Sequence, residues 1–253
     1  MKTIQRIGLG LAVCTVIFLC GCDKDSDPIV EESGEQILFG PNKTQIGDGK
    51  AEFSIKESHT IKKGTYTMVG WIYVEEGATL TIEPGTVIKG DNKNYDGQIA
   101  ATGSSLIIKR GAKIMAQGTA ASPIVFTSSQ PKGQRKASDW GGVIICGRAR
   151  NNAATSEMTI EGGVNANHGG TDDGDNSGVL QYVRIEFAGY PYKTDSEING
   201  LTLGSVGSDT TIDHVQISYC GDDSFEWFGG TVNASHLISY HSWDDDFDTD
   251  NGF

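Results

Sequence analysis

The feature that most constrains the fold of this chain is a series of short apolar runs, separated by glycines, whose pattern recurs along the sequence. From Phe53 onward the runs are three to five residues long and rich in β-branched residues, which is typical of strands. No window in this part of the sequence carries the apolar stripe of a helix. The recurrence joins three pairs of segments, at offsets of 26, 32 and 21 residues: 77–88 with 103–114, 180–189 with 212–221, and 217–219 with 238–240.

Repeats of this size predict an all-β solenoid, a parallel β-helix in which each coil contributes two or three short strands. One coil cannot bury its inward Ile, Leu and Val side chains alone. Coils stacked at the strand spacing of about 4.8 Å share one apolar core and pair their backbones along the stack. A β-sandwich, which also uses short strands and Gly-rich turns, is the alternative.

The N-terminal segment has the pattern of an export signal. Lys2 and Arg6 precede an uncharged apolar run at 7–19, which is too short to span a membrane. Residues 19–22 (LCGC) then resemble the bacterial lipoprotein box, in which cleavage precedes a cysteine that receives lipid such as palmitate. The resemblance implies that Cys22 is lipidated, and an ordinary secretory signal is the alternative.

These boundaries predict a signal peptide at 1–21, a flexible acidic tether at 22–36 and a β-helix domain at 37–253. The acidic stretch after the lipidated residue resembles the surface-export signal of Bacteroidota lipoproteins. We therefore expect a cell-envelope protein, held by lipid in the outer membrane and exposed on the cell surface. The 33 acidic and 20 basic residues give a formal net charge of −13, which repels phosphate backbones and argues against a nucleic-acid partner.

Three segments, 71–88, 221–230 and 242–250, resemble coils of right-handed parallel β-helix lipoproteins that are common in Bacteroidota. The resemblance spans about residues 50–253 and implies the pectin-lyase-like fold, in a group whose members mostly have no assigned activity. Such proteins usually continue beyond the position of Phe253. We therefore expect a truncated solenoid that lacks a C-terminal cap.

A Gly- and Asp-rich stretch contains one candidate calcium loop. Asp173, Asp175 and Ser177 follow the spacing Asp-x-Asp-x-Ser, with Gly178 next, and this spacing can place three oxygen ligands around a tight turn. The complete EF-hand pattern fails, because its twelfth position is Arg184 rather than Glu. A simple surface turn is the alternative.

The last two coils carry a second candidate metal site. Placing Phe225 over Phe247, at an offset of 22, brings acids of successive coils together: Asp222 with Asp244, Asp223 with Asp245, Ser224 with Asp246, and Glu226 with Asp248. If both Phe side chains point inward, alternation directs their neighbours outward. Carboxylates so close repel one another unless a cation neutralises them, so we predict calcium ligands. The ligands expected are Asp222, Asp244, Asp246 and Asp248, and a solvated acidic face is the alternative.

Aromatic residues flank these acids. Trp227 and Trp243 are expected to stack on a sugar ring, with Asp223 and Glu226 as polar contacts in the same glycan-binding site.

Catalysis is not expected from this chain. Gly221-Asp222-Asp223 resembles one segment of polygalacturonases, but the other segments of that family are missing. A lyase needs a Lys or Arg base, and Arg184 and Lys193 lie in no lyase pattern. We therefore assign no catalytic residue. A polysaccharide lyase or glycoside hydrolase is kept as an alternative, with acid, base or ligand roles for Asp222, Asp223, Asp244, Asp245 or Asp246.

The histidines and cysteines suggest structural roles. His214 and His236 are expected to approach each other on adjacent coils, but zinc sites usually show three or four ligands at recognisable spacing, which the sequence lacks. Cys146 and Cys220 end apolar runs and are expected to be buried thiols, with a disulfide as the alternative.

The sequence therefore predicts a lipid-anchored β-helix that binds extracellular glycan, with calcium as an optional ion. An adhesin or surface scaffold is a further alternative.

Overall fold

The computed structural model describes residues 44–91, 103–153, 157–193 and 196–253. All of them belong to one compact unit, Ile37–Phe253. The expected signal peptide, the lipidated Cys22 and the tether lie outside the described residues. Within the described ranges all regular secondary structure is β, and no helix there is long and apolar enough to cross a membrane.

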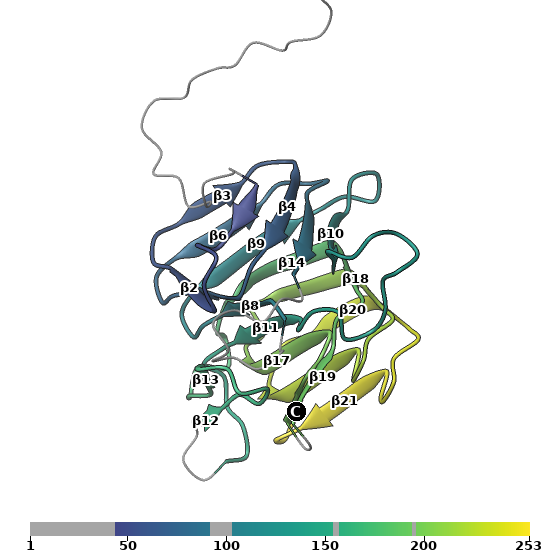
Figure 1. Cartoon of the computed structure of the whole chain (residues 1–253). Helices are drawn as coiled ribbons and strands as arrows, with labels where there is room; N and C mark the ends of the chain where they lie inside the picture. Colours follow the sequence, from purple (N-terminus) through teal and green to yellow (C-terminus); the bar gives the residue numbers. More distant parts are fainter. Residues whose placement is uncertain (1–43, 92–102, 154–156, 194–195) are drawn as a thin grey trace, which may run out of the picture. The chain divides into compact units, whose positions relative to one another are not determined.

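The strands stack as coils of a parallel β-helix, from β1 to β21 along the colour gradient of Figure 1. The coils form two main sheets, a first sheet of ten strands and a second sheet of seven. The second sheet consists of β2 (Glu52–Ile55), β5 (Trp71–Val74), β8 (Ser105–Ile108), β11 (Val143–Cys146), β17 (Leu201–Val206), β19 (Phe225–Gly230) and β21 (Phe247–Asp250).

The first sheet has ten strands, which begin as two columns. One column is β3 (His59–Ile61), β6 (Thr79–Ile82) and β9 (Lys113–Gln117); the other is β1 (Gln45–Ile46), β4 (Thr65–Met68), β7 (Val87–Gly90) and β10 (Ile124–Ser128). Both columns continue in the longer strands β14 (Gly178–Glu186), β18 (Thr211–Ser218) and β20 (Ala234–Tyr240). Every pairing within the two sheets is parallel, which confirms the β-helix and excludes the antiparallel sandwich.

The strand register confirms one predicted offset and corrects two. Leu180 pairs with Ile212, at the predicted offset of 32. Leu80 pairs with Ile114 rather than Leu106, which makes the offset 34 instead of 26. The prediction was wrong because 77–88 covers β6 and β7, whereas 103–114 covers β8 and the start of β9, so the similar segments lie on different sides of the coil.

The offset of 21 is also wrong. Ile217 pairs with Ser239, at an offset of 22, and Ile238 points outward with 54% of its surface exposed. Val215 and Leu237 point inward and pair with each other, and Ile217, which is also in the core, pairs with Ser239. The period of 22 is therefore common to the last coils in both sheets.

The long strands bend at residues in the left-handed region of backbone conformation. Tyr182, His214 and His236 have φ of 49°, 52° and 52°, and each interrupts the register of its strand. Because non-Gly residues rarely adopt this conformation, its recurrence at equivalent positions marks a corner that is repeated in successive coils of this chain. At the corner, the side chains form a stack: the ring centroids are 4.4 Å apart for Tyr182 and His214, and 4.1 Å for His214 and His236.

Two apolar clusters hold the coils together. The larger one fills the solenoid with the inward side chains of both sheets, among them Leu80, Ile114 and Phe225. The smaller one lies on the outer face of the second sheet, where Ile144 packs with Ile160 and other residues of an insertion. This insertion includes the hairpin of β12 (Met158–Thr159) and β13 (Asn167–His168), and a second hairpin pairs β15 (Tyr190–Lys193) with β16 (Ser196–Ile198).

Both predicted core thiols are buried and unpaired. Cys146 and Cys220 are 0% exposed and form no disulfide. Burial raises the pKa of each thiol to about 12, so neither is a reactive thiolate at neutral pH.

Candidate functional site

The acids of the last two coils meet as the 22-residue offset predicts. In the register of β19 with β21, Phe225 pairs with Phe247 and Glu226 with Asp248. Phe225 is fully buried in the solenoid core and stacks on Phe247, with the ring centroids 5.3 Å apart. The strand alternation therefore places Glu226 on the outer face of the second sheet.

That outer face is covered, so Glu226 does not face solvent as the solvated-face alternative supposed. It is 6% exposed, beneath Asn199 and Glu161 of the insertions. The Asn199 amide nitrogen donates to Glu226 Oε2 and, at 3.3 Å, to Glu161 Oε1. Burial and the neighbouring Glu161 raise the pKa of Glu226 to about 10, and burial also raises that of Glu161. The pair of Glu161 and Glu226 therefore holds a proton at neutral pH.

Two aspartates at the preceding corner extend the group. Burial, together with Asp223, raises the pKa of Asp222 to about 7. Burial and nearby aspartates raise the pKa of Asp223 to about 6, although its Oδ1 accepts a 2.7 Å hydrogen bond from the Asp245 backbone N–H. We call this group, Glu161, Asp222, Asp223, Glu226, Asp244, Asp245 and Asp248, the acidic cluster.

The acidic cluster contains two sets of carboxylates whose oxygens lie within 4.8 Å of one another. One is Asp223, Glu226 and Asp248, and the other is Asp223, Asp244 and Asp245. Oxygen-only sets of this kind suit calcium. Asn199 Oδ1, on a fully buried side chain, has no hydrogen-bond partner within the described residues, so one more oxygen is available there.

Asp246 lies apart from these sets, although the sequence placed it with them. Its Oδ1 accepts hydrogen bonds from Ser239 Oγ at 2.6 Å and Ser242 Oγ at 3.0 Å. These hydroxyls lower the pKa of Asp246, which stays an exposed, charged aspartate. The corner before β21 interrupts the strand alternation from which its position was inferred.

The predicted calcium loop is held by its own contacts. Asp173 Oδ2 accepts a 2.9 Å hydrogen bond from Arg150 Nε, and this guanidinium lowers the pKa of Asp173. Asp175 is buried and accepts a 2.9 Å hydrogen bond from the hydroxyl of Ser177. The two carboxylates thus have different partners, and calcium binding in this loop stays a prediction.

The two tryptophans have opposite environments. Trp227 is 5% exposed and packs in the solenoid core, where it stacks on Phe225 and Phe253. Its ring is therefore not open to a sugar, because strand alternation directs it inward with Phe225. Trp243 is 74% exposed, at the corner between β20 and β21.

Trp243 lines a cleft of about 680 Å³, which we call the Trp243 cleft. Its aromatic side contains a second stack, in which Phe187, Tyr219 and His241 lie with nearly parallel rings, the centroids 5.2 and 5.4 Å apart. Its other wall is a basic loop that carries Lys132, Arg135 and Lys136.

The charges in the Trp243 cleft are mainly positive. Among the described residues, the one carboxylate in its lining is Glu186, which lies 2.5 Å from Arg184 and accepts a hydrogen bond from Thr127 Oγ1. The Arg135 guanidinium is held by the Gln130 carbonyl, at 3.0 Å from its Nε. A protein with a net charge of −13 therefore presents a positive, aromatic cleft.

The basic wall and the cover of the acidic cluster were missed by the sequence analysis. Lys132, Arg135 and Lys136 form a run of three cations in five residues of an acidic chain, and that run was the available signal. Glu161 and Asn199 lie 65 and 27 residues before Glu226, so no local spacing connects them to it.

Comparison with known proteins supports the fold. No curated protein and no solved structure shows significant similarity to the chain. The family model of the pectate-lyase-like β-helix domain matches residues 53–253, which include nearly all of the strands described above. Since this match covers most of the sequence, the chain belongs to the pectate-lyase-like β-helix family.

Proposed function

We propose that this protein is a glycan-binding module of the cell envelope and that the Trp243 cleft is its binding site. The observation that carries the proposal is the combination of an exposed indole, a stack of aromatic rings and three cations around one cleft. Aromatic faces offer apolar area on which the C–H face of a sugar can pack, and a few polar groups then fix its orientation.

The cations indicate the class of glycan. Lys132, Arg135 and Lys136 face the cleft, whereas the protein as a whole is strongly acidic. A local positive field in a negative molecule favours anionic ligands and disfavours neutral ones. The preferred ligand is therefore an oligosaccharide with carboxylate groups, such as a uronic acid chain.

Calcium is proposed as a structural ion of the acidic cluster. Asp223, Glu226 and Asp248 supply carboxylate oxygens close to one another, and the unpaired Asn199 Oδ1 lies on the side chain that joins Glu226 to Glu161. A divalent cation would neutralise charges that otherwise require bound protons.

The proposed location rests on the sequence alone. Lipid at Cys22, followed by an acidic tether, would hold the β-helix at the outer membrane and direct the Trp243 cleft to extracellular polysaccharide. Globomycin-sensitive processing and labelling with a palmitate analogue in cells, with Cys22→Ala as the control, test this part separately.

Glycan binding is tested by calorimetry with oligogalacturonate and with a neutral cello-oligosaccharide of equal length. We expect binding of the uronic acid chain, and a loss of about tenfold or more in affinity for Trp243→Ala, since a buried aromatic contact is worth about 1.4 kcal/mol or more. The matched control is Tyr192→Ala, which removes an aromatic ring of 40% exposure outside the cleft.

Equal affinity of the wild type and Trp243→Ala would contradict the assignment of the cleft. Absence of binding to every glycan, together with binding to whole cells that glycans do not inhibit, would favour the adhesin alternative. Calcium binding is tested by the rise in melting temperature that calcium causes. Asp223→Asn should reduce this rise, whereas Asp246→Asn, outside the acidic cluster, should leave it unchanged.

The lyase or hydrolase alternative is not favoured. Of its two candidate bases, Arg184 is paired with Glu186, and Lys193 belongs to the β15–β16 hairpin. Release of unsaturated or reducing products from oligogalacturonate would overturn this view.

A further inference from the structure

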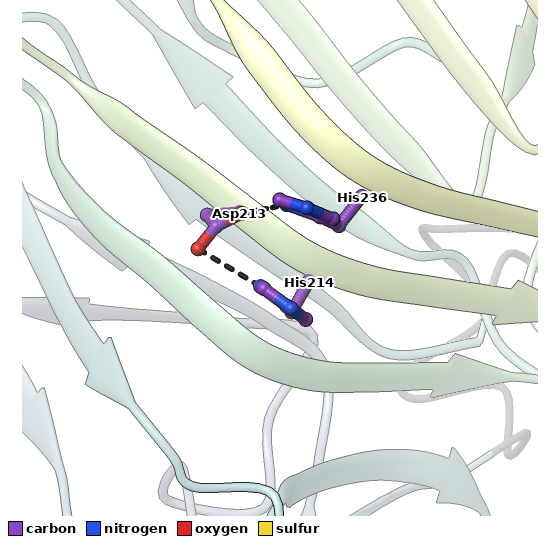
Figure 2. A group of neighbouring side chains, drawn as sticks. All are labelled: Asp213, His214 and His236. Atoms are coloured by element: carbon purple, nitrogen blue, oxygen red, sulfur yellow. Dashed lines mark hydrogen bonds and ion pairs between the residues drawn. The ribbon is translucent and has the colours of Figure 1, made fainter.

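A cluster of metal-binding side chains lies at the corner where Tyr182, His214 and His236 stack, away from both the acidic cluster and the Trp243 cleft. His214 of β18 and His236 of β20 are equivalent residues of successive coils, and Asp213 precedes His214. The two imidazole rings are 4.1 Å apart at their centroids, with planes at 17°. Figure 2 shows both rings directed at the same carboxylate.

The carboxylate of Asp213 lies between the two histidines. Its Oδ2 is 2.9 Å from His214 Nδ1, and its Oδ1 is 2.8 Å from His236 Nδ1. Gln181 Nε2 and Ser235 Oγ also donate to this carboxylate, at 3.0 and 2.8 Å. Such outer contacts fix the orientation of a ligand and are typical of metal sites.

The ring nitrogens of both histidines are turned toward this one carboxylate, and His214 Nδ1 is shielded from solvent. The orientation of both nitrogens toward one carboxylate places three ligand atoms within 4.8 Å of one another.

We propose that Asp213, His214 and His236 bind a divalent transition-metal ion such as zinc, nickel or copper. Imidazole nitrogen with one carboxylate is a donor set that these ions prefer, whereas calcium and magnesium prefer oxygen alone. Tetrahedral ligands at about 2.1 Å from zinc lie roughly 3.4 Å apart, so binding requires the two imidazole rings to rotate out of their stacked arrangement until both Nδ1 lone pairs point at the ion.

The surroundings leave room for the remaining ligands. A cleft of about 320 Å³ adjoins both histidines and is also lined by Tyr182 and Arg184. Three protein ligands and an open position for water or an exogenous group form a common arrangement for zinc. The Arg184 charge is compensated by Glu186, at 2.5 Å. The ion would join two successive coils through residues 22 positions apart.

The stack of Phe187, Tyr219 and His241 is the natural control for the proposed metal site. Its histidine, His241, has φ of 61° and stacks on Tyr219 with ring centroids 5.4 Å apart, so it repeats the conformation and the stacking of His236. It belongs to none of the groups of three metal-binding side chains found among the described residues. Stacking at a left-handed corner therefore does not by itself bring a carboxylate between rings.

The experiment is calorimetric titration of the full chain with zinc, nickel and copper chlorides, with calcium chloride as the reference ion. We expect one transition-metal ion per chain, a higher melting temperature with zinc, and affinity at least about tenfold weaker in His236→Asn and in Asp213→Asn. His241→Asn should bind zinc like the wild type. Asn is chosen because it tolerates the left-handed backbone conformation.

The proposal is overturned if the wild type binds no transition metal, or if His236→Asn and His241→Asn lose affinity equally. If the variants fail to fold, proton NMR of the wild type decides: zinc should shift the ring signals of two of the five histidines, and a shift of none or of all would contradict the site.

Discussion

The outer faces of the two sheets differ in what covers them. On the second sheet, the insertion around β12 and β13 buries Ile144 and Ile160 in a second apolar cluster, and the segment at Asn199 closes over Glu226. On the first sheet, side chains such as Arg184 and Ile238 face solvent. The same strand alternation thus produces buried acids with raised pKa values on one face and solvated pairs on the other. The comparison teaches that the burial and protonation of an outward side chain depend more on the segments packed over it than on its position in the strand pattern.

The largest expected effect tests the covered face. Ile144→Ala removes a side chain that is 1% exposed on the outer face of β11, and we expect it to lower the free energy of unfolding by about 2–5 kcal/mol. Thr81→Ala, at an outward position of β6 in the first sheet, should change it by no more than about 0.5 kcal/mol. Urea denaturation of both variants measures the difference. Equal effects would mean that the insertion does not pack on the second sheet in solution.

The next effect is a pH dependence that arises from the same cover. The pKa of Glu226 is raised from 4.5 to about 10, and those of Asp222 and Asp223 from 3.8 to about 7 and about 6. Between the unfolded and folded values, the folded state holds protons that the unfolded state has lost. The contribution of these three acids to the free energy of unfolding therefore falls as pH rises from 5 to 8. The fall exceeds the gain of roughly 2 kcal/mol from buried His168, whose pKa is lowered to about 4, so the wild type loses net stability over this range.

Glu226→Gln should flatten this dependence, because the amide stays neutral in both states. Glu57→Gln, which alters an exposed carboxyl, should leave it as in the wild type. Denaturation curves at pH 5 and pH 8, in chelator-treated buffer, make the measurement. A wild-type protein that gains stability over this range would show that the acidic cluster is open to water.

The last coils of both sheets show how much of the fold could be predicted from the sequence alone. The offset of 22 that aligned Phe225 with Phe247 was correct, and the same offset connects His214 with His236. The weaker match of Ile217 with Ile238, at 21, obscured that relation, because similar residues there lie on opposite faces of the strand. Strand existence, core positions and the parallel stack follow from local pattern and period.

The cover of the second sheet could not be predicted in this way. The insertions have no repeat, and their contacts with β19 join residues far apart in the chain, such as Glu161 with Glu226. The burial of Glu226, and with it the protonation of its carboxyl, depends on these contacts alone. A sequence pattern identifies an outward position but carries no information on what closes over it.

The smallest effect is expected on the open face. Arg184 and Glu186 form an ion pair on the outer side of β14, 2.5 Å between Nη2 and Oε1, with the Arg184 side chain 46% exposed. An exposed ion pair is only slightly more stable than the same two side chains hydrated separately. Arg184→Ala should therefore lower the free energy of unfolding by less than about 1 kcal/mol. The difference from the wild type should shrink further at high salt, since screening weakens what attraction remains. Urea denaturation of both proteins at low and high sodium chloride measures it. A loss as large as that of Ile144→Ala, insensitive to salt, would place Arg184 under cover and remove the contrast between the two faces.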